Sequence, residues 1–243
     1  MCCSLAKSDV QAAGRTETVT VAAVIFDWGG TLTPWHDIEP VAQFLAVTDD
    51  PDAAQRLCDA SELVWARSRD EQRSATLGEV FRMAGIAHTD EAVAAFHKWW
   101  EPHTFTDPDA APLLIALRER DIKVGVLSNT IWSRADHERI FDRDGLSHLL
   151  DGAVYTSEIA WTKPHRQAFQ AALEALGRPH PEATVFVGDR LFDDVHGAAE
   201  LGMRTIYIPH STIPSDQHGH TNGTPDAVVQ RLGEVLDVVD AWR

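Results

Sequence analysis

Four short polar motifs, far apart in the sequence, carry side chains that together could handle a phosphoryl group. They are Asp27-Trp28-Gly29-Gly30-Thr31, Ser128-Asn129, Lys163-Pro164 and the segment from Gly188 to Ala198. Mg²⁺ commonly takes one or two carboxylates as ligands, together with waters and substrate phosphate oxygens. Asp27, Asp189 and Asp194 could supply the carboxylates, while lysine, hydroxyl and amide groups hold the other phosphoryl oxygens. These residue types predict a magnesium-dependent site.

Asp27 has a second possible role, as a nucleophile. One of its carboxylate oxygens could attack phosphorus and so split one difficult displacement into two easier ones. The first step would leave an aspartyl-phosphate intermediate, which water would hydrolyse in the second. The glycines at positions 29 and 30 allow the backbone to approach a ligand closely and to adopt a positive φ. Asp27 is therefore the expected centre of the site.

The elements that position these motifs are short apolar runs followed by segments of helical period. Expected strands are Val21–Asp27, Lys123–Ser128, Ala153–Thr156, Thr184–Gly188 and Thr205–Ile208. Expected helices are Ala110–Arg120, Pro164–Leu176, Asp194–Leu201 and Pro225–Val239. Alternating strands and helices form right-handed crossovers in one parallel sheet, which binds ligands beyond the carboxyl ends of its strands. The expected fold class is α/β, with a Rossmann-like, doubly wound parallel sheet.

About seventy residues separate the first two expected strands, and their composition is helical. Structureless loops of that length are rare in compact domains, so residues 37–104 are expected to form an inserted helical domain. It would join the core near 33–36 and 104–108 and lie over the site as a cap. Residues 21–36 and 105–243 would form the core. Residues 1–20 are expected to be a disordered N-terminal extension, and Ile208–Pro225 a loop.

The charge and cysteine content of the chain indicate which classes of partner it could bind and where in the cell it is expected. The chain of 243 residues has 21 basic and 37 acidic residues and a net charge of −16, which argues against nucleic-acid and anionic-membrane partners. A divalent cation would reconcile this acidity with a phosphorylated ligand. The three cysteines form no disulfide framework, and the chain has neither a membrane-spanning run nor a signal-peptide core. A cytoplasmic location is expected.

The order DxxGT, SN, KP and GDxxxxDxxGA resembles the haloacid dehalogenase (HAD) superfamily of hydrolases. The resemblance covers Val21 to Pro209 outside the insertion, and the insertion resembles the family's α-helical type 1 cap. It implies that Asp27 is the nucleophile, Ser128 a phosphoryl-oxygen donor and Lys163 the orienting cation. The implied substrate-binding residues are Gly30, Thr31, Ser128, Asn129 and Lys163. The implied magnesium ligands are Asp27, the backbone carbonyl of Gly29, Asp189 and Asp194.

The first motif departs from the family's phosphatases at Gly29, where they have a second Asp as the general acid and base. Such assistance is typically worth about 10²- to 10⁴-fold in rate. The haloacid dehalogenases also lack this Asp, but they need no magnesium and do not keep the acidic fourth motif. Asp189 and Asp194 therefore argue against that activity. His36 or Asp37 could replace the acid, although ordinary loop residues are the favoured interpretation.

The phosphonoacetaldehyde hydrolases offer another alternative, because their first motif resembles Asp27-Trp28-Gly29-Gly30-Thr31. They also need a cap lysine that forms a Schiff base. Lys98 is the only lysine in the expected insertion, and a solvated surface residue is the favoured interpretation. Asp194 has an alternative of its own as the N-cap of the following helix. For Arg190, a surface role and a ligand-facing role both stay open.

The favoured hypothesis is a Mg²⁺-dependent phosphatase that acts on a small phosphorylated metabolite through an Asp27 phosphoenzyme. A catalytically attenuated ligand sensor or partner-binding protein is the rival, motivated by Gly29, but the intact Lys163, Asp189 and Asp194 argue against it. The tryptophans of the insertion are expected to pack at its seam with the core or to line a substrate pocket; they are Trp65, Trp99 and Trp100. A solvated loop rather than a metal site is expected at His210, His218 and His220.

Overall fold

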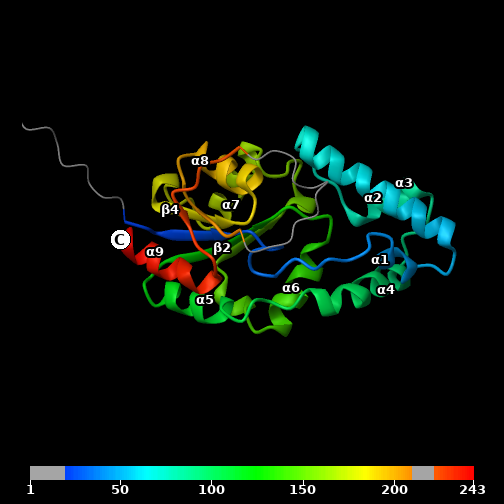
Figure 1. Ribbon diagram of the computed structural model, residues 1–243, viewed down its shortest axis with the longest axis horizontal. Coiled ribbons are helices and arrows are strands. Elements are labelled where there is room, and N and C mark those ends of the chain that lie inside the picture. The colour runs from blue at the N-terminus through cyan, green and yellow to red at the C-terminus, as the bar shows by residue number, and fades with distance from the viewer. Residues whose placement is uncertain (1–19, 210–221) are drawn as a thin grey trace, which may run out of the picture.

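The computed structural model (Figure 1) describes residues 20–209 and 222–243. It contains a six-stranded sheet in the order β3-β2-β1-β4-β5-β6. Every neighbouring pair is parallel. The strands are β1 (Ala23–Phe26), β2 (Lys123–Ser128), β3 (Gly152–Tyr155), β4 (Thr184–Gly188), β5 (Arg204–Tyr207) and β6 (Ala227–Val228). The expected α/β fold with a parallel sheet is confirmed. The expectations for the N-terminal extension and for His210, His218 and His220 lie outside the described residues.

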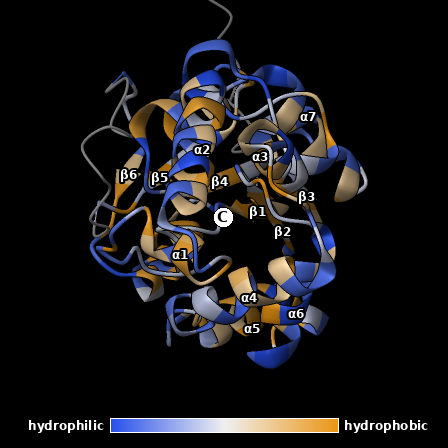
Figure 2. Cartoon of the chain, turned by 90° about the vertical axis from the view of Figure 1, so that its right-hand side faces the viewer, coloured by the Kyte–Doolittle hydropathy of each residue, from blue (hydrophilic) through white to orange (hydrophobic). Residues whose placement is uncertain are grey.

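The sheet is buried on both faces, because successive side chains of a strand point to opposite sides. Val24 and Phe26 of β1 belong to one hydrophobic cluster, and Ala23 and Ile25 belong to another. The first cluster includes residues of α5 (Ala110–Arg118), α6 (Arg134–Arg143) and α9 (Val235–Ala241), and the second includes residues of α7 (Arg166–Ala175) and α8 (Gly197–Ala199). Figure 2 shows the central strands as predominantly hydrophobic. The apolar runs of the sequence thus form the buried sheet, which is the middle layer of the fold between two layers of helices.

The last third of the chain differs from the sequence-based expectation. The helix expected over Pro225–Val239 is replaced by β6, a 3₁₀ turn (Leu232–Glu234) and α9. Asp226 accepts hydrogen bonds from the N–H and hydroxyl of Thr205, which brings the following residues alongside β5. The helix expected from Pro164 begins at Arg166, and the one expected from Asp194 becomes a π-helical turn (Leu191–His196) before α8. At β6, pairing with β5 overrides the local helical pattern.

The segment between β1 and β2 is helical, as expected. It contains α1 (Ala42–Leu45), α2 (Pro51–Glu71), α3 (Leu77–Ala84), α4 (Asp90–Trp100) and a 3₁₀ turn (Glu101–His103). Its entry and exit lie together, because the N–H of Asp107 donates to the carbonyl of Leu32 at 2.8 Å. None of the helices in the described ranges combines the length and hydropathy that crossing a membrane requires.

An aromatic seam joins this insertion to the rest of the molecule. The ring of Trp132, in the loop after β2, lies 5.9, 5.0 and 5.4 Å from the rings of Phe96, His97 and Trp100 on α4. Trp65 is partly buried against the hydrophobic cluster that contains Trp132. Trp99 contacts Trp100 and lies beside the 3₁₀ turn. These contacts support the packing interpretation of the tryptophans.

Candidate active site

Three buried carboxylates meet at the carboxyl edge of the sheet. Asp27 follows β1, Asp189 follows β4, and Asp194 lies in the π-helical turn. One oxygen from each lies within 4.8 Å of the other two, and the residues are only 6 %, 1 % and 1 % exposed. β1 and β4 are neighbours with Phe26 opposite Val187, so the carboxylates that follow them emerge side by side.

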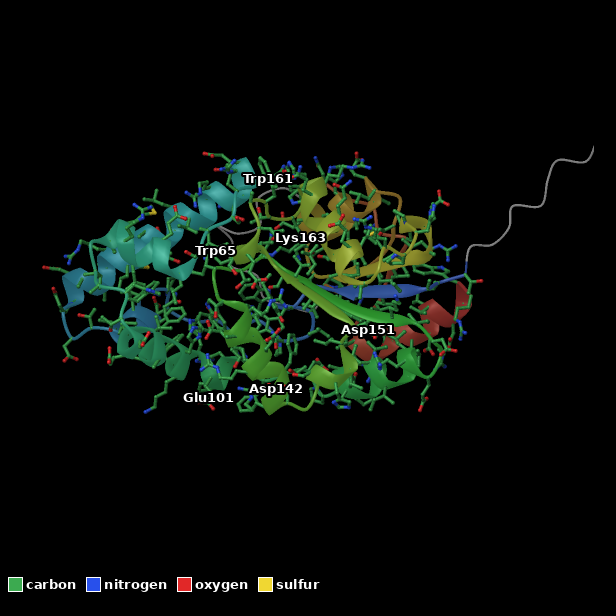
Figure 3. All side chains as sticks on the ribbon, turned by 180° about the vertical axis from the view of Figure 1, so that it is seen from behind. Trp65, Glu101, Asp142, Asp151, Trp161 and Lys163 are labelled. Atoms are coloured by element: carbon green, nitrogen blue, oxygen red, sulfur yellow. The ribbon has the colours of Figure 1, made fainter. Side chains whose placement is uncertain are left out.

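Lys163 bridges two of these carboxylates from the interior. Its Nζ lies 2.6 Å from Asp27 Oδ1 and 2.7 Å from Asp194 Oδ1. The side chain of Asn129 holds the lysine backbone, accepting from its N–H at 2.8 Å and donating to its carbonyl at 3.1 Å. The N–H of Thr162 donates to the carbonyl of Gln72, just beyond α2. Figure 3 shows Lys163 inside the molecule and Trp161 beside the end of α2.

Burial sets the electrostatics of the cluster. Burial raises the pKa of Asp27, Lys163 opposes this with its positive charge, and the Asp194 and Asp189 carboxylates add to it, so that the pKa is raised to about 7. Burial also disfavours the charge of Lys163, but the Asp194 and Asp27 carboxylates outweigh that effect and raise its pKa. Three carboxylates face one ammonium group, and all the clustered ligand atoms are oxygens. This donor set fits a hard divalent cation such as Mg²⁺.

The turn after β1 depends on Gly30, which has a φ of +90°. A Cβ at this position would lie 2.2 Å from both Asp189 Oδ2 and Trp35 Nε1. A Cβ at Gly29 would meet only the Trp35 ring, at an ordinary 3.8 Å, and Gly29 has no positive φ. The backbone therefore requires glycine at position 30 but not at position 29.

Trp35 is part of this site and was missed from the sequence. Its indole N–H donates to Asp189 Oδ2 at 3.0 Å, and the Arg190 guanidinium lies 5.5 Å from the ring centroid. The only sequence signal is its position, eight residues after Asp27 in the segment that leads into the insertion. No motif includes that position.

A family model for haloacid dehalogenase-like hydrolases matches residues 21–202, well over half of the chain. The chain belongs to this family. The hydrolase is 33% identical over 148 residues to a glyceraldehyde 3-phosphate phosphatase of Methanopyrus kandleri, covering 61% of this chain and 62% of that protein. It is 32% identical over 101 residues to a pyrimidine 5′-nucleotidase of Escherichia coli, covering 42% and 44%. The matches thus span less than two thirds of these curated relatives.

Similarity to solved structures shows the same fold. A HAD phosphatase from Thermococcus onnurineus superposes with a TM-score of 0.64 at 20% identity, over 90% of this hydrolase and 98% of that chain. At this identity the likeness establishes the architecture alone. The architecture places the ends of β1, β2 and β4 at one edge, where the hydrolase carries its buried polar cluster.

The other expected site residues have varied surroundings. Ser128 is buried at the end of β2, beside β1. Thr31 is fully buried in the turn after β1, and its hydroxyl has no hydrogen-bond partner among the described residues. His36 packs its ring 5.1 Å from that of His103. Lys98 is exposed on α4, which favours the surface interpretation.

The surroundings of Asp194 and Arg190 bear on the alternatives that the sequence left open for each of them. Asp194 lies inside the π-helical turn that begins at Leu191, so it is not the N-cap of the helix. Its Oδ2 instead accepts from the backbone N–H of Arg190 at 2.9 Å, while Oδ1 contacts Lys163. The Arg190 side chain lies against Asp193 at 3.5 Å and near Trp35. Asp194 therefore belongs to the buried cluster, and Arg190 lies beside it with a partly exposed side chain.

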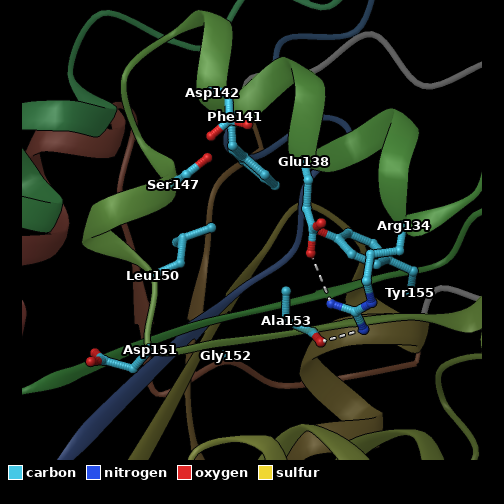
Figure 4. A pocket seen from close by; sticks show the side chains of 10 residues that line it. All are labelled: Arg134, Glu138, Phe141, Asp142, Ser147, Leu150, Asp151, Gly152, Ala153 and Tyr155. Carbon is cyan, nitrogen blue, oxygen red and sulfur yellow. Dashed lines mark hydrogen bonds and ion pairs between the residues drawn. The ribbon is translucent and has the colours of Figure 1, made fainter.

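A pocket of about 320 Å³ lies elsewhere, between α6 and β3 (Figure 4). Its charged lining residues are Arg134, Glu138, Asp142 and Asp151. Arg134 is already engaged, because it donates to Glu138 at 3.3 Å and to Glu158 at 2.7 Å. Carboxylates therefore dominate this pocket, and none of the four sequence motifs lines it. It is a poor place for a phosphate.

Proposed function

We propose that this hydrolase is a Mg²⁺-dependent phosphatase that acts on a small phosphorylated metabolite through Asp27. The observation that carries the proposal is the contact of buried Asp27 with Lys163, beside the carboxylates of Asp189 and Asp194. The similarity to a sugar-phosphate phosphatase and a nucleotidase supports phosphate-ester chemistry. Hydrolysis of a phosphate monoester is the reaction class that suits these residues.

The first half-reaction begins with Asp27. One of its oxygens forms a bond to phosphorus while the phosphorus–oxygen ester bond breaks, and the bonding electron pair leaves with the alcohol oxygen. Lys163, in contact with the same carboxylate, orients the nucleophile and holds a phosphoryl oxygen. Ser128 binds a second phosphoryl oxygen, and the Gly30-Thr31 backbone a third. Asn129 contributes by fixing the backbone of Lys163.

The second half-reaction transfers the phosphoryl group to water and regenerates the Asp27 carboxylate. Magnesium, held by Asp27, Asp189, Asp194 and the Gly29 carbonyl, would supply positive charge to the phosphoryl oxygens. The carboxylates of Asp189 and Asp194 are buried and already held by hydrogen bonds, so the chain provides an ordered ligand set. Ordered ligands reduce the reorganisation that binding requires.

Because position 29 is a glycine, we expect the rate of hydrolysis to depend strongly on the leaving group of the substrate. No carboxyl group at this position can protonate the departing oxygen, so esters with acidic leaving groups depend less on the missing donor. We therefore expect aryl and acyl phosphates to turn over faster than alkyl phosphates. The backbone does not require glycine at position 29, so no backbone constraint explains the missing carboxyl group.

Substrate selection is assigned to the helical insertion. We propose that residues 37–104 act as a cap over a core of residues 21–36 and 105–243. The cap would be held by contacts such as the N–H of Leu77 donating to the carbonyl of Ile131 at 2.7 Å. The phosphonatase-like alternative is less favoured, because its required lysine would have to be the exposed Lys98.

The test is a panel of aryl, acyl and alkyl phosphates, phosphonates and haloacids, assayed with purified protein and magnesium. We expect phosphate-ester turnover that the Asp27→Asn variant lowers by on the order of 10⁴-fold, since the nucleophile is removed. Asp142→Asn, an exposed carboxylate on α6, is the matched control and should retain full activity. Turnover that survives Asp27→Asn would contradict the proposal. Tight phosphate-ligand binding without turnover would favour the sensor instead.

A further inference from the structure

Trp35 connects the segment that enters the insertion to a carboxylate 154 residues away in sequence. Its indole N–H donates to Asp189 Oδ2 at 3.0 Å. The absence of a side chain at Gly30 creates the space for this contact, because a Cβ there would lie 2.2 Å from each partner atom. The indole also covers Gly29, with two of its ring carbons 3.8 and 4.0 Å from the position of a Cβ. Both glycines of the first motif therefore face this ring.

The second connection of Trp35 runs through Arg190. The guanidinium lies 5.5 Å from the indole centroid, within the range of a cation–π contact. The backbone N–H of Arg190 donates to Asp194 Oδ2. Trp35 is thus bonded to one of the clustered carboxylates and packs on the residue that orients another.

A carboxylate that ligates a metal needs a fixed orientation, and its outer hydrogen-bond partners commonly provide it. Each carboxylate oxygen has lone pairs enough to accept an N–H and still bind a cation. The indole N–H is a donor without charge, so it can restrain Asp189 without repelling a cation. Trp35 has the geometry for this role from outside the ligand set.

We propose that Trp35 is a positioning residue for Asp189, and that it makes the affinity for magnesium depend on the segment entering the insertion. The inference rests on the magnesium site proposed above. It deepens that proposal by naming a residue outside the four motifs. Gly30 is its necessary partner, because any side chain there would occupy the place of the hydrogen bond.

The experiment measures magnesium binding to metal-free protein by titration calorimetry at pH 8, without substrate. Trp35→Phe retains an aromatic ring but loses the N–H, and we expect the dissociation constant to rise about tenfold, at the lower end for outer-shell partners. Trp35→His places a ring N–H near the same position and should restore most of the affinity. Trp100→Phe is the matched control, because it removes an indole hydrogen bond of 3.1 Å to Gln43 inside the insertion.

The proposal is overturned if Trp35→Phe binds magnesium like the unaltered protein, or if Trp100→Phe weakens binding equally. It is also overturned if Trp35→His is as weak as Trp35→Phe, since the N–H would then be irrelevant. Thermal unfolding in EDTA verifies that all three variants are folded. If the unaltered protein does not bind magnesium, both the proposed magnesium site and the role of Trp35 are contradicted. If turnover depends on Asp27 but Trp35→Phe binds magnesium with unchanged affinity, the proposed phosphatase function is supported. Only the positioning role of Trp35 is then contradicted.

Discussion

The polar cluster at the sheet edge and the aromatic seam around Trp132 are held together by different interactions. In the cluster, a buried ammonium group lies 2.6 and 2.7 Å from two carboxylates. In the seam, rings contact one another at 5 to 6 Å, and His97 on α4 lies 3.1 Å from Asp136 on α6. Removal of one charge from the cluster leaves others unpaired, whereas a ring contact can be weakened gradually. The two regions should therefore respond differently to substitution.

Lys163→Met should have the largest effect on stability, because it leaves Asp27 and Asp194 buried without their cation. We expect the free energy of unfolding to fall by about 3 to 5 kcal/mol at pH 8. Part of the loss should recover at pH 6, because burial raises the pKa of Asp27 and a protonated carboxyl no longer needs a counter-charge. Urea denaturation of the metal-free protein at both pH values measures this.

Lys123→Met is the control for Lys163→Met. Lys123 is an exposed lysine at the start of β2, whose Nζ donates to the carbonyl of Leu176. Its loss should cost less than about 1 kcal/mol at either pH. Equal losses for the two variants, or a loss at Lys163 that does not change with pH, would show that the cluster is not governed by buried charge.

His137, next to the seam, should give an intermediate effect that depends on acid. Its ring is fully buried, 4.3 Å from Tyr155 and 4.7 Å from Trp28, and burial lowers its pKa to about 4. The unfolded state therefore binds a proton more readily than the folded state, and stability is lost as pH falls from about 6.5 toward 4. The loss should be roughly 2 to 3 kcal/mol.

His137→Phe removes the titrating group but keeps a ring, so the acid-induced loss should be smaller in this variant. Urea denaturation at pH 7 and pH 4.5 gives the comparison with the unaltered protein. His148→Gln, at an exposed position, should leave the pH dependence unchanged. An acid-induced loss as large in His137→Phe as in the parent would assign it to other groups.

His97→Gln should have the smallest effect. It weakens the link between α4 and α6, and we expect a loss of about 1 kcal/mol in stability. The kcat for the best phosphate ester should change less than about twofold, because no residue of the polar cluster is touched. Arg139→Gln removes an exposed partner of the same Asp136 carboxylate and should be nearly neutral. A large fall in kcat with His97→Gln would show that the seam and the site are one unit.

Much of the fold follows from local pattern. The limits of β2 and β4 agree with the expected strands to the residue, because a strand buried on both faces must be a continuous apolar run. β6 was not predicted from the sequence, because a strand of two residues carries no periodic signal. It pairs with β5 directly after Asp226, which accepts a hydrogen bond from Thr205 across 21 positions of the chain.

Which chemical groups reach the sheet edge follows from residue order and strand pattern alone. Strand patterns place Asp27, Ser128 and Asp189 at or just after strand ends, and a parallel sheet brings such ends together. Which atoms come into contact depends on how the chain folds. Lys163 lies between Asp27 and Asp194, Asn129 binds the lysine backbone, and Trp35 reaches Asp189 across 154 residues. The reason is physical: a residue's type and strand position are local properties, whereas a hydrogen bond between distant segments depends on strand order, loop packing and the space that Gly30 leaves open.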